Sequence, residues 1–213
     1  MKKRIISAFV VAFLLCSVGI PAGAAKIEEA QTFALYEEIV SEINEQYNTQ
    51  ITLYSIPESM SVTEFQAMLT NMAISNARAK VSIKRAKTLN TTVENTAAYT
   101  TADTETVNIG KSGDDWVVLI CKDVIIGPSD YGTKFYSASS SNVTSKAAHP
   151  VLSPCSYEMT DKYALICDAG ASLEIGATGT LTAHSSSGID YFQWKDYSTS
   201  VVCSTSDTVN IYF

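Results

Sequence analysis

The sequence predicts an α+β protein in which an N-terminal two-helix segment precedes an all-β antiparallel sandwich or barrel domain. Apolar residues recur at helical spacing before residue 90 and alternate with polar residues at period two beyond residue 104. A stretch rich in Thr, Ala and Asn, without apolar periodicity, separates the two regions. We therefore expect a signal peptide at 1–25, a helical region at 26–90, a linker at 91–103 and a β-sandwich-like domain at 104–213.

The N-terminus has the three parts of a secretory signal peptide. A cationic start, Met1 to Arg4, is followed by an apolar run to about Ile20 and by the small residues Ala22-Gly23-Ala24. The apolar run is shorter than the roughly 20 residues that a spanning helix needs. We expect cleavage near Ala24 or Ala25, a secreted or extracytoplasmic location, and no stable membrane span after leader removal.

The lone cysteine of this leader, Cys16, does not predict a lipid anchor. Lipidation sites place a small residue directly before the cysteine, whereas Leu14 and Leu15 are bulky. Cys16 is therefore expected to leave with the leader.

The charge of the chain is acidic. Its formal net charge is −7, and loss of Lys2, Lys3 and Arg4 with the leader lowers this to −10. Nucleic-acid binding depends on clustered Lys and Arg, so we expect no nucleic-acid partner. No sequence feature indicates a cofactor.

Two amphipathic helices are predicted in the helical region. The first runs from Lys26 to about Gln50, and glutamates occupy its polar face. Ser61-Val62-Thr63-Glu64 is a capping box that begins the second, which runs to about Leu89. The two could pack as a hairpin. Basic residues near the end of the second helix are spread around its circumference, which favours a solvated face over a binding patch; they are Arg78, Lys80, Lys84, Arg85 and Lys87.

The β region contains roughly seven or eight short strand-like runs separated by turn residues. In residues 172–184, Leu173, Ile175 and Ala177 alternate with Glu174 and Thr178, which predicts one buried and one wet face. The other runs are TVNI, WVVLICKDVII, KFYSAS, KYALICD, DYFQW, SVVCS and TVNIYF.

Four cysteines remain after the leader, and an even number in an exported chain favours two disulfides. Their three possible connectivities stay open, and buried free thiols are the alternative. The spacing lacks the paired C-x₂-C pattern of zinc sites, so we expect no metal. The candidates are Cys121, Cys155, Cys167 and Cys203.

No catalytic motif is apparent. Residues 110–116, GKSGDDW, lack the first glycine and the helix of a phosphate-binding loop and are better explained as a hairpin turn. The chain has two histidines, His149 and His184, and no G-x-S-x-G or H-E-x-x-H pattern surrounds them. We predict a protein without catalytic activity. The alternative is a small secreted hydrolase that uses His149 or His184.

Aromatic residues in DYFQWKDY suggest a binding surface. Strand alternation places Phe192 and Trp194 on a core face. The opposite face would carry Tyr191, Gln193, Lys195 and Tyr197, and tyrosines supply rigid contact area with a polar tip. The predicted function is a secreted bacterial binding or surface-interaction protein whose partner is an unidentified extracellular protein or glycan. A second alternative is a processed effector or inhibitor with a helical pro-region, cut at Lys84-Arg85.

Overall fold

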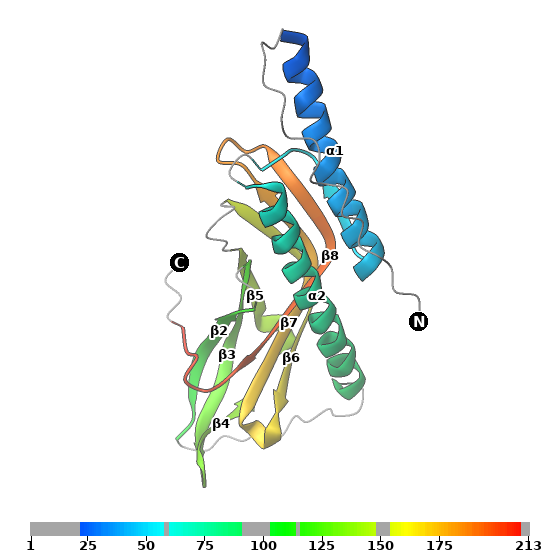
Figure 1. The fold of residues 1–213 in the computed structure, drawn as a ribbon. Helices are drawn as coiled ribbons and strands as arrows, with labels where there is room; N and C mark the ends of the chain where they lie inside the picture. The colour runs from blue at the N-terminus through cyan, green and yellow to red at the C-terminus, as the bar shows by residue number, and fades with distance from the viewer. Residues whose placement is uncertain (1–21, 58–59, 91–102, 114–115, 148–153, 210–213) are drawn as a thin grey trace, which may run out of the picture.

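The computed structural model describes residues 22–57, 60–90, 103–113, 116–147 and 154–209 (Figure 1). The predicted leader up to residue 21 and almost all of the predicted linker lie outside these residues. Two helices and mostly antiparallel sheets make up the described chain, in agreement with the predicted class. Helix α1 spans Ala22–Tyr47, and α2 spans Val62–Asn90.

The start of α2 is the predicted capping box. The backbone N–H and the hydroxyl of Ser61 donate to Glu64 Oε2 at 2.9 and 2.7 Å. In return, the Glu64 N–H donates to Ser61 Oγ at 3.3 Å. Two backbone donors that the first helical turn leaves free are thereby satisfied.

The two helices contact each other, as a hairpin requires. The rings of Tyr36 in α1 and Phe65 in α2 lie 5.0 Å apart, and the Tyr36 hydroxyl donates to the Met60 carbonyl at 2.7 Å. Asn48, at φ 50°, ends α1 in the left-handed region, which Asn tolerates better than most residues.

A short strand that the sequence does not predict follows α1. Strand β1, Gln50–Leu53, pairs antiparallel with β8, Asp190–Cys203, so that Ile51 lies opposite Trp194. This sheet has the order β1-β8-β7-β6, where β7 is Ser172–His184 and β6 is Cys155–Cys167. The helical region thus contributes a strand to the C-terminal sheet.

The second sheet is built around β3, Val117–Ser129. Strand β2, Glu105–Ser112, pairs along one edge of β3. On the other edge, β5, Val143–Ala147, pairs with the first half of β3 and β4, Gly132–Ser137, with the second half. The Gly113 N–H donates to the Val117 carbonyl at 3.2 Å between β2 and β3, which pair as neighbours. Gly110 to Ser112 of the predicted turn lie within β2, and Asp114 and Asp115 lie outside the described residues.

One hydrophobic core joins the helices and both sheets. Phe65 and Leu69 of α2, Leu119 of β3 and Leu173 of β7 are all fully buried and belong to the same cluster. The sheets contact each other through β2, β3, β4 and β5 of one and β6, β7 and β8 of the other, most extensively between β5 and β6. Removing either part would therefore expose apolar surface of the other.

The expected wet face of β7 is not uniformly wet, because α2 crosses β6, β7 and β8 (Figure 1). Glu174 is only 2% exposed, and its carboxylate accepts from Arg85 of α2 and from the Tyr163 hydroxyl at 2.9 Å. A buried carboxylate is tolerated when it is paired and hydrogen-bonded. Arg85, expected on a solvated face, therefore attaches α2 to the sheet.

Candidate functional site

The structure separates the four residues of the predicted binding face. Phe192 and Trp194 are fully buried, as predicted. Tyr191 and Gln193 are half-buried, and Lys195 is exposed. Tyr197, however, is fully buried and packs its ring 5.1 Å from that of Trp194. The predicted position of Tyr197 on the exposed face is therefore wrong.

A β-bulge explains this difference. Between the pairs Leu181–Trp194 and Gly179–Tyr197, β8 advances three residues while β7 advances two. Asp196, at φ 54°, is the residue in the left-handed region at this irregularity. One extra residue reverses the alternation beyond it, so Tyr197 shares the buried side with Trp194.

The exposed part of the predicted face continues onto β1. Gln50 lies opposite Lys195, and Thr52 lies opposite Gln193. The next residue of this face, Tyr54, is 51% exposed, and its N–H donates to the Tyr191 carbonyl at 2.9 Å. We name this area the β1–β8 surface; it consists of Gln50, Thr52, Tyr54, Tyr191, Gln193 and Lys195.

His184 lies beside this surface in a chain of three polar side chains. Its Nε2 lies 3.0 Å from Ser156 Oγ, and its Nδ1 lies 2.6 Å from Asp190 Oδ1. Ser156 is on β6, His184 ends β7 and Asp190 begins β8. The other histidine of the predicted alternative, His149, lies outside the described residues.

The sequence predicts part of this hydrogen-bonded arrangement of Ser156, His184 and Asp190. The runs SLEIGATGTLTAH and DYFQW flank the short turn SSSGI, so a hairpin brings His184 opposite Asp190. The strand that carries Ser156 was missed, although Cys155, Tyr157 and Met159 alternate there with polar residues, which is the signal that could have placed Ser156 on an exposed face.

All four candidate cysteines are free thiols in this structure, so the expected disulfides are not formed. Cys121 and Cys203 are buried in the core, whereas Cys155 and Cys167 are partly exposed. Cys155 and Cys167 stand at opposite ends of β6, roughly 40 Å apart at about 3.3 Å per residue, and cannot bridge each other.

Burial controls the acidity of these thiols. Loss of solvation raises the pKa of Cys121 to about 11 and that of Cys203 to about 12. The pKa of Cys167 is also raised, first by burial and then by the neighbouring Glu174 carboxylate. A raised thiol pKa lowers the fraction of reactive thiolate at neutral pH. Cysteine nucleophiles have a lowered pKa instead, so these thiols do not have the acidity of a nucleophile.

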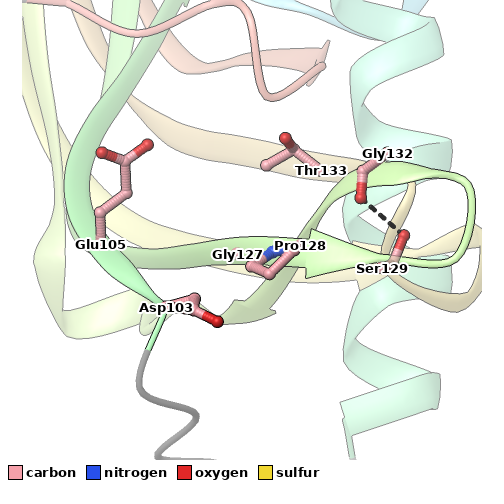
Figure 2. Close-up of a pocket in the computed structure, with 7 residues that line it drawn as sticks. All are labelled: Asp103, Glu105, Gly127, Pro128, Ser129, Gly132 and Thr133. Carbon is pink, nitrogen blue, oxygen red and sulfur yellow. Dashed lines mark hydrogen bonds between the residues drawn. The ribbon is translucent and has the colours of Figure 1, made fainter.

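An open depression of about 430 Å³ lies between the start of β2 and the β3–β4 turn (Figure 2). Asp103 and Glu105 line one side, and Ser129, Gly132 and Thr133 line the other. The Ser129 hydroxyl donates to the Gly132 carbonyl at 2.8 Å and so is used within the turn. Small-molecule sites are usually lined by aromatic or aliphatic side chains, and the lining residues here provide none apart from Pro128.

The described residues show neither a metal-ligand cluster nor a membrane-spanning helix. Within them, no group of three or more His, Cys, Asp or Glu side chains is placed to hold a metal ion. Neither described helix combines the length and the apolar character required to cross a membrane.

No protein-family model matches the chain, and neither a curated protein nor a solved structure is significantly similar to it.

Proposed function

We propose that this chain is an exported bacterial protein that binds an extracellular protein or glycan through the β1–β8 surface. The observation that carries the proposal is the pairing of two tyrosines: Tyr54, exposed directly after β1, donates its N–H to the carbonyl of Tyr191, which is half-buried on β8 and also packs against the core. Tyr rings on a rigid sheet offer contact area at low entropic cost, together with hydroxyls that can donate or accept.

The polar neighbours of the tyrosines support the same proposal. Gln193 provides an amide and Lys195 provides a cation on the same face, while Trp194 and Phe192 anchor the strand in the core. Because buried side chains hold the backbone of this surface in place, the surface loses little conformational entropy on binding. The ligand class is an uncharged or acidic polymer, because Lys195 is the charged group of this surface.

Export is the second part of the proposal, and its support is the N-terminal leader pattern. Helix α1 begins at Ala22, so cleavage near Ala24 or Ala25 would remove only its first turn. From residue 30 on, where burial is described, the first buried residue is Tyr36, well beyond either position. The intact-mass measurement of protein recovered from the culture medium should therefore show a chain beginning near Ala25 or Lys26.

For the scaffold, we propose a sandwich-like arrangement of the two sheets. Its support is that buried residues of both sheets, such as Leu119 and Ile175, belong to one core. The pro-region alternative is disfavoured by the same core, since α2 contributes Phe65 and Leu69 to it.

The binding proposal can be tested with the exported protein on a glycan array and on immobilised peptidoglycan. Tyr191→Ala should weaken any binding by roughly tenfold or more, as expected for an aromatic contact residue. Tyr131→Ala is the matched control, because Tyr131 is 101% exposed on the β3–β4 turn, outside the β1–β8 surface. Equal affinities for the two variants, or the absence of binding by the folded protein, would contradict the proposal.

A further inference from the structure

The Ser156, His184 and Asp190 side chains form one continuous hydrogen-bonded chain. Ser156 Oγ lies 3.0 Å from His184 Nε2, and His184 Nδ1 lies 2.6 Å from Asp190 Oδ1. The first distance falls in the range of good hydrogen bonds, and the second is slightly shorter than that range, as expected for a close contact with a carboxylate. Each ring nitrogen thus has its own partner, one a hydroxyl and the other a carboxylate.

Backbone pairing holds the three residues on one face of the sheet. His184 and Asp190 are register partners at the end of the β7–β8 hairpin. Ser156 is the register partner of Thr182, which lies two residues before His184 and hence on the same face. The His184 N–H also donates to the Pro154 carbonyl at 3.0 Å, which ties β7 to the start of β6.

The carboxylate determines the direction of the hydrogen bonds in the neutral ring. Ionised Asp190 can only accept hydrogen bonds, so the ring proton is on Nδ1, and Nδ1–H donates to Asp190 Oδ1. Nε2 is then the basic nitrogen and accepts from the Ser156 hydroxyl. This is the arrangement in which a serine hydroxyl is activated by an oriented imidazole.

Exposure differs among the three side chains, and the carboxylate is more exposed than the imidazole, unlike the buried Asp of an enclosed triad. The His184 side chain is 23% exposed and that of Asp190 is 44% exposed, while Ser156 is exposed on its strand. The hydroxyl is accessible to a substrate, and the base behind it is partly covered.

We propose that Ser156 and His184 are catalytic residues of an esterase site and that Asp190 is the positioning residue. Ser156 Oγ attacks the ester carbonyl carbon while its proton passes to His184 Nε2. Collapse of the tetrahedral intermediate breaks the bond to the alcohol, which leaves with that proton. Water then attacks the acyl-serine, giving one proton to Nε2, and the carboxylic acid departs as Ser156 recovers its hydrogen.

The substrate class follows from the openness of the site. A partly solvated His–Asp pair gives a weaker electrostatic contribution than an enclosed one. Esters have better leaving groups than amides and need less assistance. We therefore assign the site to carboxylic esters.

The test uses the exported protein with 4-nitrophenyl acetate and a fluorophosphonate probe. We expect hydrolysis above the buffer rate and phosphonylation mapped by mass spectrometry to Ser156. Ser156→Ala should abolish the labelling and lower kcat by roughly 10²-fold or more. Ser206→Ala is the matched control, since Ser206 is an exposed turn serine that bonds Ser204 and should leave both signals unchanged.

Variants of the other two residues separate catalysis from a structural role. His184→Asn should remove labelling while Ser156 is still present. Asp190→Asn should lower kcat with little change in KM, and Asp190→Glu should restore part of the rate. A structural hydrogen-bond chain would instead change the unfolding temperature without these kinetic effects.

This proposal is independent of the binding proposal, because 4-nitrophenyl acetate requires no recognition surface. If folded Ser156→Ala hydrolyses the ester at the original rate, or if the probe labels other serines but not Ser156, the esterase site does not exist.

Discussion

At the scale of single residues, the cysteines show how burial controls chemistry. Cys121 and Cys203 are 0% and 1% exposed, and burial raises the pKa of both thiols. A thiol with a raised pKa is almost fully protonated at pH 8, so it reacts slowly as well as being covered. Cys155 and Cys167 are only partly buried.

We predict that iodoacetamide at pH 8 modifies the partly exposed Cys155 and Cys167 in the folded protein but not Cys121 or Cys203, and that Cys167 reacts more slowly than an ordinary thiol because its pKa is raised. Peptide mapping by mass spectrometry gives the result for each residue. In guanidinium chloride, all four cysteines should react at similar rates, which serves as the control. Rapid modification of Cys121 in the folded state would contradict its burial, and unreactive cysteines after unfolding would indicate disulfides.

At the scale of secondary-structure elements, the start of α2 depends on a single serine. Ser61→Ala removes a hydroxyl that accepts from the Glu64 N–H, and the typical loss for such a cap is about 1 kcal/mol. We predict a decrease of that size in the free energy of unfolding measured with urea. Ser82→Ala is the control, because Ser82 lies inside α2, where Ala is the better helix former and should not destabilise.

This cap also has a defined pH dependence. Hydrogen bonds from Ser61 lower the pKa of Glu64 below its ordinary value of 4.5. A group whose pKa is lower when folded stabilises the protein above its unfolded pKa and loses that contribution as the pH falls through the folded value. The difference between the original protein and Ser61→Ala should therefore shrink below about pH 4.5 and stay constant from pH 6 to 8. A difference that grew on acidification would contradict this account.

Elements with strong local patterns could be predicted from the sequence, and those that depend on distant partners could not. The capping box and apolar spacing located α2, and period-two alternation located β7. Strand β1 has only four residues and forms because β8 provides an edge for it. Alternation also failed beyond Asp196, where one extra residue reverses the faces of β8.

In the candidate site, too, the contacts set by a local pattern could be predicted, and those set by distant partners could not. The pairing of His184 with Asp190 follows from the turn between two recognisable strands. The contact with Ser156 depends on the register of β6 against β7, which no local pattern specifies. Tyr54 was missed for a similar reason, since its neighbour Tyr191 comes from a strand at the other end of the chain.

At the scale of the whole molecule, the core is shared by segments far apart in the sequence. Ile51 of β1 and Phe65 of α2 cover Trp194 and Phe192 of β8. Each fully buried side chain of this size contributes roughly 1.5–3 kcal/mol. Asn76 of α2 adds a buried hydrogen bond by accepting from the Ser198 N–H at 2.8 Å.

We therefore predict that residues 104–213 do not form a stable native fold when they are produced alone. Without β1, α1 and α2, the fragment would expose Phe192 and leave the Glu174 carboxylate without Arg85. Several uncovered core side chains, at roughly 1.5–3 kcal/mol each, are comparable to the whole 5–15 kcal/mol by which domains are typically stable. The fragment should bind the dye ANS and unfold without a cooperative transition, whereas residues 26–213 should unfold cooperatively.

Adding the missing part in trans distinguishes loss of core contacts from a general failure to fold. Residues 26–90, co-expressed with residues 104–213, should restore the cooperative transition and suppress ANS binding, since β1 and α2 can dock without the connecting segment. The variant Phe65→Ala in the helical fragment should weaken this rescue because it removes the ring that contacts Phe192, 6.2 Å between centroids. A 104–213 fragment that is as stable alone as residues 26–213 would show that the β region carries its own complete core.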